Sequence, residues 1–167
     1  PENEWSLFHL FFKPTDMKRI KEYKTLFNVE GALDLKDLKK TYRGLVKQWH
    51  PDKFQDDDAR KGEAELMGKK VIDAYHFLVS MAPETKEKNL PEYKKTIDDC
   101  GIENYKHKGL LLELSFTNGA VYEYFGVTPA LFKKLINSDK QIRFAKRSIF
   151  HSFPYRQSKK AQEPEMA

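Results

Sequence analysis

Residues 34–53 of the chain read DLKDLKKTYRGLVKQWHPDK, and this stretch decides the fold of the N-terminal half. Asp34 can cap the start of a helix, and Asp37 adds negative charge to its first turn. Pro51 disfavours the helical conformation at His50, so the helix should end near Trp49. Apolar side chains recur in between at spacings of three and four, the pattern of one buried helix face: Leu35, Leu38, Tyr42, Leu45, Val46 and Trp49.

A second helix is expected over 58–81, beyond a polar stretch rich in aspartate. It shows the same apolar spacing in Ala64, Met67, Val71, Ala74, Tyr75 and Leu78. Tyr23, Leu26 and Phe27 indicate a short helix before Gly31. The sequence therefore predicts a short helix followed by an antiparallel helical hairpin.

The turn of this hairpin carries His50, Pro51 and Asp52. Proline stiffens the loop and lowers the entropy cost of binding, and the aspartate offers an acceptor for an arginine of a partner. A basic stripe shares one face of the preceding helix, at spacings of four, three and four: Lys36, Lys40, Arg43 and Lys47. A lysine stripe alone is usually only a solvated face, but its position beside this tripeptide favours a binding surface.

Residues 38–53 resemble the second helix and the His-Pro-Asp loop of the J domain of Hsp40 co-chaperones. The similarity extends back to Tyr23 and forward to Leu78, so it covers roughly 20–82. It implies that the basic stripe docks on an acidic surface of an Hsp70 ATPase domain, where the loop triggers ATP hydrolysis. The residues that the resemblance and the stripe assign to Hsp70 binding are Lys36, Lys39, Lys40, Tyr42, Arg43, Lys47, His50, Pro51, Asp52 and Lys53.

The C-terminal part predicts a β-hairpin followed by two helices. Runs over 110–116 and 120–125 are rich in β-formers, and Asn118-Gly119 between them is a strong hairpin signal. Alternation places Leu112, Leu114 and Phe116 on one face of the hairpin. Thr128-Pro129 should open one helix, and 140–149 forms the next.

Residues from about 100 to 157 resemble a KTSC domain, through the stretches LELSFTNG at 112–119 and YEYFGVTP at 122–129 and the closing FPYR at 153–156. The resemblance raises nucleic-acid binding as a role. Residues 104–158 hold nine Lys and Arg against three Asp and Glu, a net charge of +6 in a chain whose total is +5. The candidate contacts for RNA or DNA are Lys133, Lys134, Lys140, Arg143, Lys146 and Arg147.

The interleaved Phe132 and Phe144 could stack on bases, but the favoured interpretation is that they belong to the core of a small domain. The alternative for the basic residues is that they only keep this domain in solution.

The fold class is therefore mainly α with a small α+β module, a J-domain hairpin followed by a β-hairpin plus helices. The predicted organisation is an apolar N-terminal extension over 1–19, a J domain over 20–82, a linker over 83–103, a KTSC-like domain over 104–158 and a disordered tail over 159–167. The segment 5–12 is too apolar for a free tail, so it should pack as added core or bind a partner.

Several kinds of chemistry are not expected. Cys100 is the single cysteine, so it forms no internal disulfide and no cysteine pair for zinc, which fits a reducing, cytoplasmic location. The five histidines lack metal-ligand spacing, and no Gly-rich phosphate loop is present, so we expect no metal, no cofactor and no intrinsic ATPase. The apolar run at 5–12 is interrupted by Ser6 and His9, so neither a signal peptide nor a membrane span is expected.

The leading hypothesis is an Hsp70 co-chaperone, not an enzyme, whose C-terminal module selects a client or a nucleic acid. The main alternative is a nucleic-acid-binding protein in which the J-like hairpin is only structural. A more distant alternative is a phosphodiester hydrolase that uses the dispersed histidines.

Overall fold

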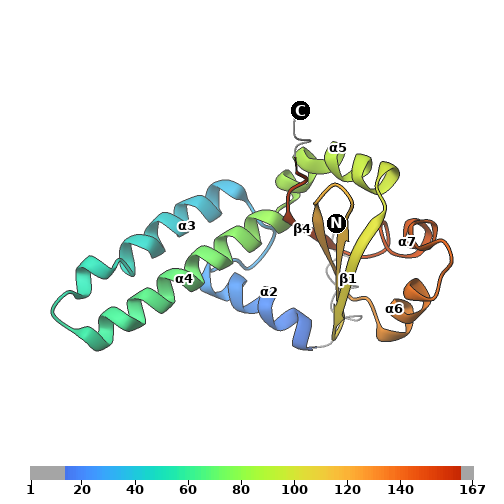
Figure 1. Cartoon of the computed structure of the whole chain (residues 1–167). Coiled ribbons are helices and arrows are strands. Elements are labelled where there is room, and N and C mark those ends of the chain that lie inside the picture. The colour runs from blue at the N-terminus through green and yellow to red at the C-terminus, as the bar shows by residue number, and fades with distance from the viewer. Residues whose placement is uncertain (1–13, 163–167) are drawn as a thin grey trace, which may run out of the picture. The chain divides into compact units, whose positions relative to one another are not determined.

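A computed structural model describes residues 14–162 of the chain, with side chains from residue 18 onward (Figure 1). These residues form two compact units. One is helical and runs from Ile20 to Glu87, whereas the other combines the residues up to Arg19 with those from Lys88 onward. The two boundaries, after Arg19 and after Glu87, both fall inside helices. The apolar stretch 5–12 lies outside the described residues.

The helical unit contains the expected hairpin. Helix α2 (Pro14–Leu26) precedes α3 (Leu35–Gln48), the short 3₁₀ helix η1 (Pro51–Phe54) and α4 (Asp58–Met81). α3 packs against α4, and the fully buried side chains of this unit include Leu38, Val71 and Leu78. The periodicity in the sequence is thus confirmed, because these residues lie at its predicted apolar positions.

Both long helices begin at an aspartate cap. The Asp34 side chain accepts a hydrogen bond from the Asp37 backbone N–H at 3.0 Å. Asp57 accepts from the N–H groups of Ala59 and Arg60 at 3.1 and 3.2 Å. These bonds satisfy amides that a helix start leaves without an intrahelical partner. Pro51 and the Asp57 cap therefore place the loop between the two helices.

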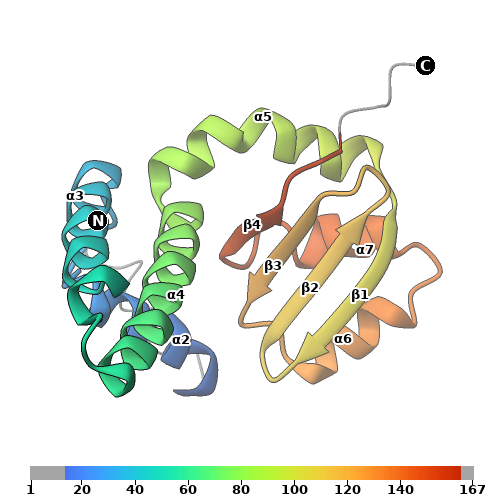
Figure 2. The ribbon, with the colours of Figure 1, turned by 60° about the vertical axis from the view of Figure 1, so that its left-hand side comes forward.

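The second unit is the α+β module. It holds most of α5 (Pro83–Asp99) and a four-stranded antiparallel sheet in the order β1-β2-β3-β4. The strands are β1 (Ile102–Lys108), β2 (Leu111–Phe116), β3 (Val121–Phe125) and β4 (Tyr155–Lys159). Helices α6 (Pro129–Ile136) and α7 (Gln141–Ser148) lie behind the sheet in Figure 2. The predicted fold class is confirmed.

The predicted β-hairpin is formed by β2 and β3, with Leu114 paired to Tyr122. The turn needs glycine for two reasons. Gly119 has φ +83°, and a Cβ there would lie 2.8 Å from Cγ of Gln162. After the hairpin, the Thr128 hydroxyl accepts from the Leu131 N–H at 3.2 Å and caps α6 as expected.

One face of the sheet packs on α5, α6 and α7 to form the core of this module. The hydroxyl of Tyr93 on α5 donates to the Phe150 carbonyl at 3.0 Å and lies 3.1 Å from the Tyr124 hydroxyl. Because Tyr93 has a single hydroxyl proton, Tyr124 must donate to Tyr93. Burial raises the pKa of both phenols. Phe132 and Phe144 pack partly buried against this core, which confirms their interpretation as core residues.

The expected linker over 83–103 is wrong as a description of the backbone. α5 occupies 83–99, and β1 begins at Ile102. Pro83 suits a first helical turn, whereas Pro91 lies inside the helix and cannot donate a backbone hydrogen bond. The helix persists because Tyr93, Thr96 and Ile97, at spacings of three and four, are buried.

The expected disordered tail over 159–167 is also wrong for its described part. β4 continues to Lys159, and the Ala161 N–H donates to Oε1 of Glu92 at 3.1 Å. The Gln162 N–H donates to the Asn118 carbonyl at 2.8 Å. These contacts fix the chain on α5 and on the hairpin turn, partners that no local pattern reveals. Residues 163–167 lie outside the described range.

A row of four charged residues crosses the sheet face opposite the core, one on each strand. The pairing aligns Lys106 with Glu113, Glu113 with Glu123, and Glu123 with Arg156. Two glutamates directly opposite each other repel, so the row depends on the cations at its ends. We call Lys106, Glu113, Glu123 and Arg156 the charge row.

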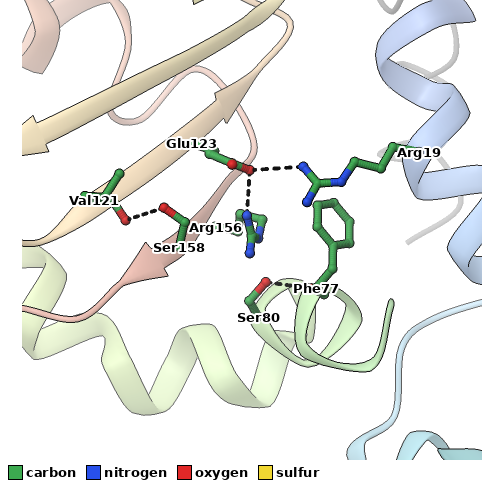
Figure 3. Close-up of polar contacts among 7 residues, drawn as sticks. All are labelled: Arg19, Phe77, Ser80, Val121, Glu123, Arg156 and Ser158. Atoms are coloured by element: carbon green, nitrogen blue, oxygen red, sulfur yellow. Dashed lines mark hydrogen bonds and ion pairs between the residues drawn. The ribbon is translucent and has the colours of Figure 1, made fainter. Parts of the chain in front are cut away.

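Glu123 is the most shielded carboxylate of the charge row, with 7% of its surface exposed. The Arg156 Nη1 donates to its Oε2 at 2.6 Å, and Nη1 of Arg19 lies 3.8 Å from the same oxygen. Both guanidinium groups point at this carboxylate in Figure 3, which also shows the Ser158 hydroxyl donating to the Val121 carbonyl. Arg156 therefore compensates a charge that water reaches poorly.

Replacing Arg156 with alanine should destabilise the α+β module by about 3 kcal/mol, because it leaves a shielded carboxylate beside a second glutamate. Urea unfolding followed by tyrosine near-UV circular dichroism measures the loss. Lys106→Ala is the matched control, since its ammonium is largely exposed and lies 4.0 Å from Glu113. Equal stability of Arg156→Ala and the control would contradict this assignment.

Candidate partner-binding site

A groove of about 510 Å³ lies at the tip of the helical hairpin, where α3 passes into η1. In Figure 1 this tip is the end of the hairpin where the chain passes from α3 to α4. The groove is lined by Tyr42, Arg43, Val46, Lys47, His50, Asp52 and Lys53. The structure thus brings together six of the residues expected to bind Hsp70, and Val46 joins them.

The His-Pro-Asp tripeptide forms the start of η1. His50 occupies the N-cap position, and Pro51 follows in the first turn, where a missing N–H costs little. The Asp52 backbone N–H donates to Nδ1 of His50 at 3.3 Å, and the Lys53 N–H donates to the His50 carbonyl at 3.0 Å. The Trp49 and Phe54 rings stack at 6.4 Å across the base of this loop. The loop is therefore held in one conformation by its own groups.

Nδ1 of His50 also lies 3.4 Å from Oδ2 of Asp52. A ring nitrogen that accepts the Asp52 N–H cannot donate to the carboxylate at the same time. With a neutral imidazole, the nitrogen caps η1 and leaves the carboxylate, which is exposed, to accept from a partner. The geometry thus presents Asp52 as an acceptor.

The basic stripe is exposed along α3. Lys36, Lys40, Arg43 and Lys47 all face solvent, and so does Lys39. Among the residues that the structure describes, none of these five cations has a carboxylate within ion-pair distance. Only Arg43 and Lys47 reach the groove, whereas the other three lie on the first half of the helix.

Tyr42 and Val46 form the apolar side of the groove. The Tyr42 ring stacks on Tyr75 of α4, with centroids 4.2 Å apart and planes 16° apart. The expected partner residue Tyr42 is therefore positioned by the helix packing beneath it. Val46 was expected only as part of the buried face. Its position one turn before His50 was the available signal that it would line the groove.

The candidate nucleic-acid residues lie on α6, on α7 and at the start of α7. Lys133, Lys134, Lys140, Arg143 and Arg147 are exposed. Lys146 differs, because its Nζ lies 3.1 Å from Oδ1 of Asp98 on α5. Lys140 and Arg143 meet at a second groove of about 540 Å³, where Asp139 also lies. The structure thus brings Lys140 and Arg143 together, whereas Lys146 forms an ion pair with Asp98.

Residues 102–153 match the KTSC domain family. Over 140 residues the chain is 26% identical to a protein named Co-chaperone protein HscB homolog from Neisseria gonorrhoeae, covering 77% of each chain. It is 40% identical over 60 residues to the protein of that name from Neisseria meningitidis, covering 34% of this chain and 36% of the relative. No solved structure matches with significance.

A further relative is the Chaperone protein DnaJ of Thermoplasma volcanium, 38% identical over 81 residues, which are 48% of this chain and 19% of that protein. This similarity agrees with the geometry of the helical hairpin, and the KTSC match accounts for the C-terminal part of the chain. The chain is a J-domain-like protein with a C-terminal KTSC domain.

The KTSC match begins with β1 and ends after α7, so it leaves out α5 and β4. Both elements nevertheless belong to the packed module. Tyr93 of α5 stacks on Tyr155 of β4 with ring centroids 4.1 Å apart. In this J-domain-like protein the KTSC domain is therefore extended at both ends, and the two extensions pack on each other.

Two findings concern membranes and metals. Within residues 14–162, no helix is both long and apolar enough to cross a bilayer. In the same range, no three His, Cys, Asp or Glu side chains gather where they could hold a metal ion. His107 has another partner, since its Nε2 lies 2.7 Å from the Val127 carbonyl and must donate to it.

Proposed function

We propose that this J-domain-like protein is a co-chaperone that stimulates the ATPase of an Hsp70 partner through its His-Pro-Asp loop. The observation that carries the proposal is the single groove in which His50 and Asp52 lie beside Arg43 and Lys47. The names of the relatives, co-chaperone and DnaJ, support the same role. The chemistry then belongs to the partner, and the chain itself is no enzyme. A cytoplasmic location goes with this proposal.

The charges of the site define the partner surface that fits it. Exposed, unpaired cations on α3 favour an acidic surface, and complementary charge speeds encounter more than it strengthens the final complex. The exposed Asp52 carboxylate suits an arginine at the point of contact, because such pairs can form two parallel hydrogen bonds. We therefore assign docking to the stripe and triggering to the loop.

Asp52→Asn and His50→Gln should each abolish stimulation of the cognate Hsp70 ATPase while the chain still folds. The first removes the charged acceptor, and the second replaces the ring that caps η1. Steady-state ATP turnover by the Hsp70, with and without the variant, measures the effect. Asp56→Asn is the matched control, because Asp56 is exposed in the same loop and does not line the groove. Full stimulation by a folded Asp52→Asn chain would disprove the proposed trigger.

Reversing the stripe with Lys40→Glu and Arg43→Glu should weaken Hsp70 binding by at least tenfold, since like charges across an interface cost several kcal/mol. Binding isotherms at several salt concentrations should also lose most of their salt dependence. Lys61→Glu with Lys69→Glu provides the control, because both lysines are exposed on α4 and introduce the same charge change. If both double variants bind equally, the stripe is only a solvated face.

We infer nucleic-acid binding by the KTSC domain as a second candidate function. The observation in its favour is the exposure of five cations on and beside α6 and α7, two of them at one groove. This activity could select the site at which the co-chaperone works. It could also stand alone, with the J-like hairpin serving a structural purpose.

Lys133→Gln, Lys140→Gln and Arg143→Gln together should lower affinity for single-stranded RNA or DNA and flatten the log-log salt dependence by about 0.7 to 0.9 per lost phosphate contact. Fluorescence anisotropy at several salt concentrations measures both quantities. A control variant with Lys88, Lys94 and Lys95 of α5 changed to glutamine removes the same charge elsewhere. Absence of binding by the parent chain at low salt would assign the basic excess to solubility.

A further inference from the structure

Strand β1 lies at one edge of the KTSC sheet. The order β1-β2-β3-β4 leaves one side of β1 without a neighbour among the described strands, and Figure 2 shows this edge on the side of the sheet away from β4. Only Gly109 and Leu110 lie between β1 and β2, and the residues that flank this turn, Lys108 and Leu111, are paired. In a two-residue hairpin such a flanking pair exchanges both ladder hydrogen bonds.

Alternation from this pair decides which backbone groups of β1 face outward. Counting back from Lys108, Lys106 bonds to β2, whereas the N–H and C=O groups of Tyr105 and His107 point away from the sheet. The Tyr105 N–H agrees with this direction, because it donates to the Asn104 side-chain oxygen at 2.9 Å. The other three outward groups have no hydrogen-bond partner among the residues that the structure describes. Such an edge can accept a further strand.

Asn104 guards part of this edge. Its side chain occupies the Tyr105 N–H, and a register shift between Ile102 and Asn104 interrupts the ladder just before it. Irregularities of this kind discourage indiscriminate pairing of an edge strand. Rotation of one exposed side chain is enough to release the amide. The edge is therefore open at His107 and can be opened at Tyr105.

The second groove of the KTSC domain, of about 540 Å³, begins at the N-terminal end of β1. Ile102 of β1 and Ile142 of α7 supply its apolar lining, and Lys140 and Arg143 supply its cations. His107 lies five residues further along β1 than Ile102, a distance of about 16 Å along a strand. A short extended segment is therefore long enough to pair with the edge and reach the groove.

The charges around the edge favour an acidic partner. Lys106 and Lys108 are exposed on β1 and the groove adds two cations, against the exposed carboxylates of Glu103 and Asp139. A nucleic acid also complements positive charge, but its phosphates only accept hydrogen bonds, and the outward carbonyls of β1 need donors. A polypeptide strand offers donors and acceptors at the spacing of the edge. The edge therefore fits an extended peptide better than a phosphate backbone.

We propose that β1 binds an extended acidic segment of another protein by strand addition. The segment pairs with the outward groups of Tyr105 and His107, displaces the Asn104 side chain, and places apolar side chains against Ile102 and Ile142. Its carboxylates lie beside the cations of the groove. This surface offers the proposed co-chaperone a place to hold a client. Its test uses no Hsp70, so failure of strand addition and failure of ATPase stimulation are seen separately.

The probe is a fluorescein-labelled peptide of about ten alternating valine and glutamate residues, titrated with the full chain and followed by anisotropy. The acidic peptide should bind, and a peptide with lysine in place of glutamate should bind at least tenfold more weakly. Lys140→Gln with Arg143→Gln should weaken binding of the acidic peptide and reduce its salt dependence. Absence of binding by the acidic peptide, or equal binding of the two peptides, overturns the proposal.

His107→Pro and His107→Ala separate strand addition from attraction between charges. Proline removes the outward N–H and places its ring at the open edge, but it leaves the ladder intact because His107 does not bond to β2. Alanine removes the same imidazole and its bond to the Val127 carbonyl, yet keeps the N–H. The proline variant should bind the acidic peptide at least tenfold more weakly than the alanine variant. Equal affinities of two variants with the same circular dichroism contradict strand addition.

Asn104→Ala tests the guard and does not depend on the folding of a proline variant. It frees the Tyr105 N–H for the incoming strand, so the acidic peptide should bind about threefold more tightly. Asn137→Ala is the control, because Asn137 is exposed at the end of α6 and does not line the groove. Unchanged or weaker binding by Asn104→Ala counts against pairing at Tyr105.

Two further results assign the edge to another occupant. If sedimentation shows that the parent chain is a dimer and that His107→Pro dissociates it, a second copy of the chain occupies β1. If the peptide does not bind, and single-stranded RNA binds His107→Pro tenfold more weakly than His107→Ala, a nucleic acid occupies it. Either result overturns the peptide proposal.

Discussion

The packing of α3 against α4 is the contact on which the candidate partner-binding site depends. Ala64 and Ala74 of α4 are completely buried, and such small side chains allow two helix backbones to approach closely. Leu38 of α3 is also buried, and the Tyr42–Tyr75 stack continues the contact towards the loop. The helices then fix both ends of the loop, so the basic stripe and the tripeptide keep a constant spacing.

A single buried phenol has a comparable place in the KTSC domain. A polar group in an apolar core costs free energy unless it is hydrogen-bonded, and the Tyr93 hydroxyl meets this condition with two partners. Tyr124 lies on β3 and Phe150 follows α7. Both hydrogen bonds can therefore form only when α5 lies in one position. Burial raises the pKa of Tyr93, so its proton is retained well into the alkaline range.

Elements with strong local signals could be predicted from the sequence, and elements held by distant contacts could not. Asp34, Pro51 and the apolar spacing define α3, and Asn118-Gly119 defines the hairpin turn. By contrast β1 and β4 are edge strands whose side chains are mostly exposed or half-buried, so neither has the alternation of a half-buried strand. β4 also pairs with β3 across about thirty residues of chain.

The same rule applies to the two candidate sites. The His-Pro-Asp loop is a local feature, so its residues could be named in advance, and the fold only adds Val46 to them. The basic residues of the KTSC domain lie on separate elements, and their availability depends on neighbours. Asp98 removes Lys146 from the exposed set, and it lies on a helix that the sequence did not predict.

The composition of the hairpin groove decides what kind of complex it can form. Its lining combines Val46 and the half-buried Tyr42 with five charged or titratable residues, whose side-chain stems add to its apolar surface. The groove is small, so the apolar area that it can bury is small, and exposed charges contribute more to the rate of encounter than to residence time. A partner bound in this way associates quickly and leaves readily. That behaviour fits the proposed role as a co-chaperone.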